Sequence, residues 1–297
     1  MIRHYVGRWD DPSQFVTPKP YAGHVNGYKR FELVDHTIIE CSVHMGLALV
    51  DIEPGGYLNP ALHAFEKGFY VLEGSLVGHL DGRDVQLSKG DYGVIPMGAT
   101  YAWRNTGAEK ARLLEMMSPQ PKPESYLFKD TLFIQDGHAP DSGMTIDFKD
   151  PRVSKYLGHF DDSQLPKTGG EIQAVGARGG AIHGISLKEL IDRMLGAQHM
   201  SLFMVQFQPD GEGTVHDHMF EESYFLVSGE AEASLDGKTY RVKAGEYVWT
   251  GVGCMHGFKN VGDAPVRWIE TQSPLPTPTE AFRFKAQWEY LRQKIED

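Results

Sequence analysis

The sequence has few of the features that mark secreted or membrane-spanning proteins. Among its 297 residues there are two cysteines, Cys41 and Cys254, which lie far apart and form no recognisable motif. We therefore expect no disulfide framework, and we expect a reducing, cytoplasmic location. The N-terminal stretch lacks the apolar core of a signal peptide. No run approaches the roughly 18 apolar residues of a membrane-spanning helix, so we expect no contact with a membrane.

Positive charge is also scarce, because 29 Lys and Arg stand against 40 Asp and Glu and give a formal net charge of −11. Nucleic acids bind basic surfaces, so a nucleic acid is not an expected partner. The hydrophobic content of 41% and the charged content of 23% are ordinary for a globular protein. The length suits two domains, each large enough to bury its own core.

Glycine, by contrast, is abundant at 33 residues, and several glycines recur at a fixed interval. The stretch that starts at Phe69 aligns without a gap with the stretch that starts at Tyr224, at a constant offset of 155 residues. The matched identities are mostly turn residues: Gly74 and Gly229, Leu80-Asp81-Gly82 and Leu235-Asp236-Gly237, Gly90 and Gly245, Tyr92 and Tyr247, Gly98 and Gly253, Asn105 and Asn260. Asp-Gly between alternating runs is a strong β-hairpin signal. The repeat therefore predicts two all-β domains of short antiparallel strands, closed into sandwiches or barrels.

The expected organisation has three parts. We predict an N-terminal barrel over residues 1–117, a linker with irregular structure over 118–180, and a C-terminal barrel over 181–297. Two helices are also predicted. One begins at the capping box Ser186–Glu189 and carries an apolar stripe as far as Leu195, and the other begins near Thr277 and is expected to cover a barrel end or a partner subunit.

The start of the second repeat holds the candidate metal ligands. His216, His218, Glu222 and Tyr224 have the same parity, so on strands their side chains point to one side, the interior of a small barrel. Two imidazoles and a carboxylate are costly to bury unpaired, and one divalent cation satisfies all of them. We expect His256, just beyond a glycine turn, to be the fourth ligand. Four ligands leave two positions open in an octahedral shell, as in a catalytic site.

These residues resemble the two motifs of the cupin superfamily. His216, His218, Glu222 and Gly229 match G-x5-H-x-H-x3,4-E-x6-G, with Asp210 where its first glycine stands. Gly245, Gly253, His256 and Asn260 match G-x5-P-x-G-x2-H-x3-N, with Gly251 in place of proline. The resemblance implies a bicupin with two jelly-roll-like barrels in tandem and one divalent metal per chain. Iron(II) or manganese(II) is expected, with nickel, cobalt and zinc as alternatives. It also favours a homodimer.

The N-terminal half lacks most of these ligands. At the 155-residue offset, Ala61 stands for His216, His63 for His218, Lys67 for Glu222 and Tyr101 for His256. Since a lysine ammonium would lie where the cation belongs, we predict no metal in this barrel. A structural role is expected, and binding of an organic anion by His63, Lys67 and Tyr101 is the alternative.

Five residues are predicted to lie around the metal. Tyr224 and Glu270 are candidate catalytic residues, Tyr224 through its hydroxyl and Glu270 as a general base. Gln206, Tyr224, Phe258 and Trp268 are expected to line a substrate pocket. The sequence does not fix the direction in which Glu270 points.

Three functions follow from this site. The first is an oxygen-dependent, dioxygenase-like oxidoreductase that uses O2 on a small chelating organic acid, enol or hydroxyaromatic compound. The second is a redox-neutral manganese hydrolase, isomerase or decarboxylase. The layout and the FYVLEG stretch at Phe69 are similar to ureidoglycine aminohydrolase, although that family uses Glu-x-His-x3-His at the first motif and glutamine at the second. The third is a binding module without catalysis.

Overall fold

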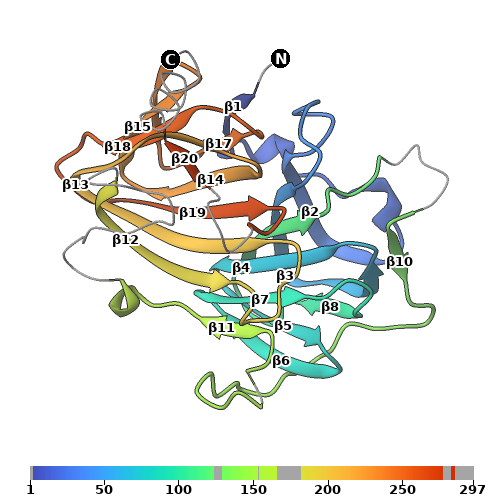
Figure 1. Cartoon of the computed structure of the whole chain (residues 1–297). Coiled ribbons are helices and arrows are strands. Elements are labelled where there is room, and N and C mark those ends of the chain that lie inside the picture. The colour runs from blue at the N-terminus through green and yellow to red at the C-terminus, as the bar shows by residue number, and fades with distance from the viewer. Residues whose placement is uncertain (1–2, 124–128, 153, 166–181, 277–281, 285–297) are drawn as a thin grey trace, which may run out of the picture. The chain divides into compact units, whose positions relative to one another are not determined.

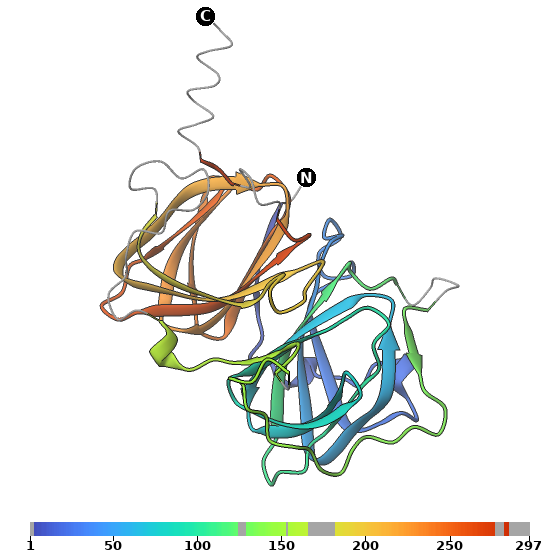
Figure 2. The ribbon, with the colours of Figure 1, turned by 60° about the horizontal axis from the view of Figure 1, so that its bottom comes forward.

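The computed structural model describes residues 3–123, 129–152, 154–165, 182–276 and 282–284. They form two compact units (Figure 1). The N-terminal unit comprises Asp11–Asp161 and Leu190–Ser201, and the C-terminal unit comprises Met1–Asp10, Asp162–Glu189 and Leu202–Asp297. Figure 2 shows the strands of each unit curving round an interior. The predicted fold class is confirmed, because each unit is a barrel-like β-sheet of the tandem cupin type.

The two units repeat one strand order. In the N-terminal unit the order is β11-β7-β4-β9-β3-β8-β5-β6, with β2 and β10 paired to β3. The strands are β2 (Val25–Val34), β3 (Gly46–His63), β4 (Glu66–Glu73), β5 (Ser75–Leu80), β6 (Arg83–Ser88), β7 (Asp91–Ile95), β8 (Tyr101–Arg104), β9 (Ala111–Ser118), β10 (Thr131–Phe133) and β11 (Leu157–His159). Two short 3-10 helices, η1 (Pro12–Gln14) and η2 (Lys19–Tyr21), precede β2.

The C-terminal unit has the order β1-β17-β14-β19-β13-β18-β15-β16, with β12 and β20 paired to β13. Its elements are β1 (His4–Arg8), η3 (Asp162–Gln164), β12 (Ile182–Ile191), β13 (Ser201–His218), β14 (Glu221–Ser228), β15 (Glu230–Leu235), β16 (Lys238–Lys243), β17 (Glu246–Thr250), β18 (His256–Asn260), β19 (Val266–Ser273) and β20 (Phe282–Phe284). The first strand therefore belongs to the C-terminal unit. The stretch 118–180, expected to be a linker, supplies β10 and β11 to the N-terminal unit.

The residues of the repeat hold equivalent turns. Asp81-Gly82 and Asp236-Gly237 have positive φ at both positions, as a type I′ hairpin requires. Asn105 donates its side-chain amide to the carbonyls of Ile52 and Glu109, and Asn260 donates likewise to Phe207 and Ala264. These side chains fix the exit of β8 and of β18, which explains why both halves carry asparagine there.

The predicted helix after Ser186 is wrong, because residues 182–191 form β12 and pair with β13. The side chains of Leu187 and Met194, both in the apolar stripe, are 40% and 91% exposed. Pairing along an 18-residue strand outweighs a local capping signal. The helix predicted from Thr277 lies outside the described residues, apart from 282–284, which form β20 against β13.

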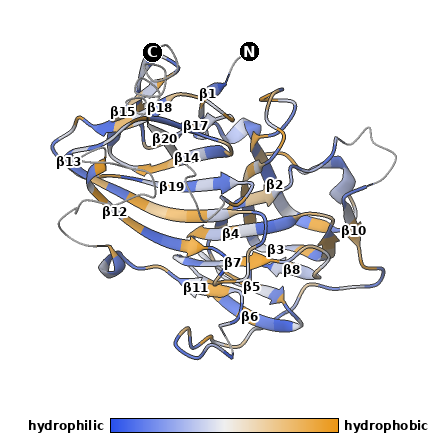
Figure 3. Ribbon diagram, in the orientation of Figure 1, coloured by the Kyte–Doolittle hydropathy of each residue, from blue (hydrophilic) through white to orange (hydrophobic). Residues whose placement is uncertain are grey.

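Each barrel buries its own hydrophobic core. Aromatic and aliphatic side chains of alternating strand positions fill the interior, including Phe69 and Trp103 in the N-terminal unit and Phe207 and Trp268 in the C-terminal unit. Figure 3 shows hydrophobic colour along part of β13, whereas many loops are hydrophilic. No helix of the described part of the chain is long and apolar enough to cross a lipid bilayer.

Candidate metal centre

Three strands bring the predicted ligands together in the C-terminal barrel. His216 and His218 end β13, Glu222 follows the turn into β14, and His256 begins β18. His216 is the direct cross-strand neighbour of His256. His218 and His256 are fully buried, and Glu222 is 1% exposed. We call these four residues the C-terminal cluster.

The ring nitrogens and carboxylate oxygen of the C-terminal cluster lie close enough together to surround one ion. The three imidazoles each offer a ring nitrogen within 4.8 Å of the others. Glu222 Oε2 lies 2.8 Å from His218 Nε2 and 3.2 Å from His256 Nε2. Neighbouring ligands of an octahedral ion with bonds of about 2.1 Å lie about 3 Å apart, so the spacing is compatible with one cation.

The backbone sets the orientation of each imidazole. His216 Nδ1 lies 2.8 Å from the Thr214 carbonyl, His218 Nδ1 2.8 Å from that of Phe220, and His256 Nδ1 2.9 Å from that of Cys254. A carbonyl only accepts, so Nδ1 carries the hydrogen in all three rings. In the neutral form, each Nε2 then presents a lone pair, which is the arrangement seen in metal-binding histidines.

The donor set fits a divalent cation. His256 Nε2 is buried and makes no hydrogen bond within the described residues, although Glu222 Oε2 lies 3.2 Å away. Burial, followed by the neighbouring His256, lowers the pKa of His216 to about 3, so its ring is neutral near pH 7. Burial alone would raise the pKa of Glu222, but His218 and His256 outweigh it and hold that pKa well below its usual range. Three imidazoles that gather their Nε2 atoms around one buried carboxylate form a donor set that a divalent cation would satisfy.

Two further side chains hold Glu222 in place. The Tyr224 hydroxyl donates a short hydrogen bond to Glu222 Oε2, and Gln272 Nε2 donates to Glu222 Oε1 at 2.7 Å. Burial, then the charges of Glu222 and Glu270, raise the pKa of Tyr224 well above its usual value. Tyr224 therefore keeps its proton, and its contacts are those of a residue that positions Glu222.

Glu270 points to the same face as the C-terminal cluster. It lies opposite Tyr224 in the register of β14 and β19. Trp268 Nε1 donates to Glu270 Oε2 at 3.0 Å, and Gln272 Nε2 lies 3.3 Å from Glu270 Oε1. Burial and then the charge of Glu222 raise the pKa of Glu270 to about 8. The sequence did not assign a role to Gln272, although its parity with Trp268 and Glu270 is a signal that could have found it.

The remaining predicted pocket residues divide between two faces. Phe258 and Trp268 pack with Tyr224 in the barrel core, with ring centroids 4.4 Å and 6.1 Å from that of Tyr224. Gln206 is not brought to the C-terminal cluster. Its Oε1 accepts hydrogen bonds from Arg267 at 2.6 and 3.2 Å. The neighbouring residues Val205 and Phe207 point to the opposite face, into the barrel core. Its assignment to the pocket is therefore corrected, since the period of two turns Gln206 to the opposite face.

The equivalent position of the N-terminal barrel is filled by a lysine. Lys67 Nζ donates to the Tyr101 hydroxyl at 2.8 Å and to Glu115 Oε2 at 2.9 Å, and His63 Nε2 lies 2.7 Å from the same hydroxyl. Glu115 stands at the 155-residue offset from Glu270. The ammonium of Lys67 thus supplies positive charge in this barrel, and the absence of a metal there stays a prediction.

Comparison with known proteins assigns both halves to one family. The model of the cupin domain matches residues 48–117 and 203–271, which contain β4 to β8 with most of β3 and β9, and β14 to β18 with most of β13 and β19. Among solved structures, the oxalate decarboxylase of Lactobacillus farciminis, a formate complex, superposes with a TM-score of 0.66 at 16% identity and covers 100% of this chain and 93% of that one. At this identity the likeness concerns the fold.

Two curated relatives come from Streptomyces. The chain is 35% identical over 99 residues to the polyketide synthase CurC of Streptomyces cyaneus, which covers 33% of this chain and 63% of the relative. It is 31% identical over 80 residues to the tetracenomycin polyketide synthase protein TcmJ of Streptomyces glaucescens, covering 26% of this chain and 54% of the relative. The chain thus spans less than two thirds of the length of either relative, and the match concerns about one barrel.

Proposed function

Because the chain is a bicupin, a member of the cupin superfamily, we propose that it is a metal-dependent enzyme that moves protons on a small chelating substrate in its C-terminal barrel. His216, His218, Glu222 and His256 would hold the divalent ion. When bound, the ion supplies Lewis-acid polarisation of oxygen atoms that chelate it. We therefore place the redox-neutral hypothesis before the oxygen-dependent one, because a proton-transfer reaction uses the second carboxyl group described below.

The observation that carries the proposal is the second carboxyl group beside the C-terminal cluster. Burial and the charge of Glu222 raise the pKa of Glu270 to about 8, so this carboxyl group favours its protonated form more than an exposed glutamate does. Its two oxygens are oriented by Trp268 and Gln272. A carboxyl group tuned in this way can deliver a proton to a substrate carbon or remove one from it. Phe258 and Trp268 are buried and pack against each other, so we expect them to exclude bulk water from this proton.

The proposed substrates are enolisable carbonyl compounds, including organic acids, and hydroxyaromatic compounds. Members of both classes that carry a second oxygen close to the first offer two oxygen atoms for chelation and a carbon that exchanges a proton. The names of the two curated relatives mention polyketide synthases, and polyketide intermediates carry enolisable carbonyl groups. This supports a substrate of that chemical type.

Deuterium exchange tests the proposal. The α-proton of a β-diketone such as acetylacetone would be followed by NMR in D2O with metal-loaded protein. We expect Glu270→Gln to slow the protein-dependent exchange by about 10²- to 10⁴-fold while the metal content stays unchanged. His256→Ala should lose both the metal and the exchange. His183→Ala, at an exposed position of β12, is the matched control and should lose neither. Full exchange activity in Glu270→Gln would contradict the assigned role.

A second candidate is the oxygen-dependent reaction. The packed aromatic rings of Tyr224, Phe258 and Trp268 support it, since a dry apolar wall protects reactive species from water. An oxygen electrode separates the two candidates. Substrate consumption that continues in the absence of O2 favours proton transfer, whereas uptake of one O2 per substrate favours oxygenation.

A further inference from the structure

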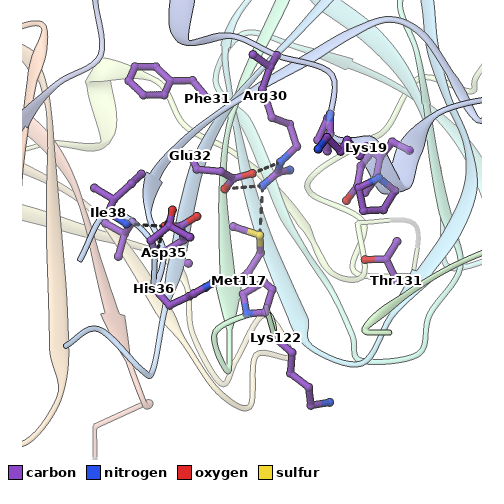
Figure 4. A pocket seen from close by; sticks show the side chains of 18 of the residues that line it. Lys19, Arg30, Phe31, Glu32, Asp35, His36, Ile38, Met117, Lys122 and Thr131 are labelled. Carbon is purple, nitrogen blue, oxygen red and sulfur yellow. Dashed lines mark hydrogen bonds and ion pairs between the residues drawn. The ribbon is translucent and has the colours of Figure 1, made fainter. Parts of the chain in front are cut away.

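The N-terminal unit contains a cavity of about 690 Å³, and all the residues that line it belong to that unit. Its walls come from η2 and the segment before it, the second half of β2, the segment after β2, and the end of β9. Figure 4 shows Arg30, Glu32 and Met117 next to one another on its wall. This volume lies within the range of about 300 to 1,000 Å³ that small-molecule sites occupy.

Arg30 is the buried charged group of this cavity, since its side chain is 4% exposed. Nε donates to Glu32 Oε1 at 2.8 Å, and Nη1 donates to Glu115 and, at 3.3 Å, to the Tyr28 hydroxyl. Nη2 has weaker acceptors, because it faces the Met117 sulfur at 3.3 Å and Glu32 Oε2 at 3.4 Å. A thioether is a poor acceptor, so Nη2 can gain a stronger bond from a carboxylate.

The buried positive charges around Arg30 outnumber the buried negative charges unless Glu32, in the cavity wall, is counted. Arg30 and Lys67 both donate to the same oxygen of Glu115, which is completely buried. These three residues carry two positive charges and one negative charge. Glu32, with a side chain 36% exposed, supplies the second negative charge from the cavity side. A buried cation needs a counter-ion, and a carboxylate that enters the cavity can take the place of Glu32.

The rest of the wall exposes more apolar than polar surface, although Gln14, Thr17, His36 and Lys122 also line it. Tyr21, Val34, Phe65 and Met117 line the cavity, and Lys19 lies on η2 beside them. Asp35 also lines it, but its carboxylate accepts the backbone amides of Thr37 and Ile38. An occupant should therefore combine one carboxylate with an apolar body.

We propose that this cavity binds a small amphipathic carboxylic acid, whose carboxylate pairs with Arg30 in place of Glu32. The site is independent of the proposed metal chemistry, because all its residues belong to the N-terminal unit. It gives the barrel that lacks the cupin ligands a binding role of its own.

Calorimetric titration of the full-length protein with benzoate, naphthoate and octanoate, and with the primary amide of each, tests the proposal. The amides have the same shape without the charge. At least one acid should bind at least about tenfold more tightly than its amide, because the charge-assisted bond is lost in the amide. Absence of binding by all three acids, or equal binding of acid and amide, would overturn it.

Two variants with opposite expected effects locate the site. Arg30→Gln should weaken binding of the acid by at least about tenfold, and Glu32→Gln should strengthen it because a competing anion is removed. The two side chains differ in burial, so Glu32→Gln tests the proposal even where Arg30→Gln does not fold. His256→Ala should bind the acid as wild type does. Loss of binding in His256→Ala, or weaker binding in Glu32→Gln, would place the acid elsewhere.

Discussion

At the scale of single residues, the two barrels differ most at the pair Lys67 and Glu222, which correspond at the 155-residue offset. Glu222 is a buried anion among imidazoles, whereas Lys67 is a buried cation that contacts Tyr101 and Glu115. The same place in the fold thus carries either a site for a cation or a cation that belongs to the chain. Together with Ala61 in place of His216 and Tyr101 in place of His256, this exchange removes three of the four candidate ligands from the N-terminal barrel.

Lys67 makes stability depend on pH in a defined direction. Burial, the largest cause, lowers its pKa from 10.5 to about 8. Below pH 8 the full cost of burying the ammonium is present. Between pH 8 and 10.5 the unfolded chain keeps a proton that the folded chain has released, so this contribution to stability rises with pH. The shift corresponds to about 3 kcal/mol.

Urea unfolding of the wild type and of Lys67→Met across this pH range measures the effect. The wild type should gain about 3 kcal/mol relative to the variant as the pH rises from 8 to 10.5. Other groups that titrate in the range affect both proteins and cancel in the difference. A constant difference between the two proteins would show that Lys67 does not titrate as assigned.

Much of the candidate site could be predicted from single residues. The parity of His216, His218, Glu222 and Tyr224 and the glycine turn before His256 were sufficient to indicate a shared face. The direction of Glu270 could not be predicted, because strand parity leaves two faces open until a partner strand fixes one. Gln206 was misplaced for the same reason, and only its contact with Arg267 settles its side.

At the scale of elements, hairpins were predictable and β12 was not. Asp-Gly turns depend on the φ angles of two residues, which local sequence specifies. The segment 186–191 also carries a local helix signal, but its conformation is decided by β13, a strand whose pairing no local pattern reveals.

The turn at Gly237 gives a test at this scale. Gly237 has φ +79°, and an added Cβ would meet no atom within 4 Å. Gly237→Ala should therefore lower the free energy of unfolding by about 1 kcal/mol through backbone strain alone. Gly213→Ala is the control in the same unit, because an added Cβ there meets only ordinary contacts, the nearest 3.7 Å away at Phe207. Equal urea midpoints for Gly237→Ala and wild type would contradict the assigned turn.

At the scale of the whole molecule, the repeat predicted two barrels, and the chain forms two units. It did not predict that β1 joins the sheet of the C-terminal unit, because the pairing of β1 with β17 links residues far apart in the chain. The predicted homodimer stays a prediction.

The asymmetry between the barrels should be visible in hydrogen exchange. Removal of metal with a chelator should speed amide exchange in β13, β14 and β18, because bound metal stabilises the strands that hold it. The equivalent strands β3, β4 and β8 serve as the internal control and should exchange at an unchanged rate. Equal changes in both sets of strands, measured by mass spectrometry, would contradict a single site in the C-terminal barrel.

The most direct test of the central claim is anomalous diffraction from crystals of the protein loaded with Mn²⁺. The account predicts one strong manganese peak per chain, bounded by the Nε2 atoms of His216, His218 and His256 and by a carboxylate oxygen of Glu222, and no peak beside Lys67. A map with no peak among those four side chains, or with its only peak elsewhere in the chain, would contradict it.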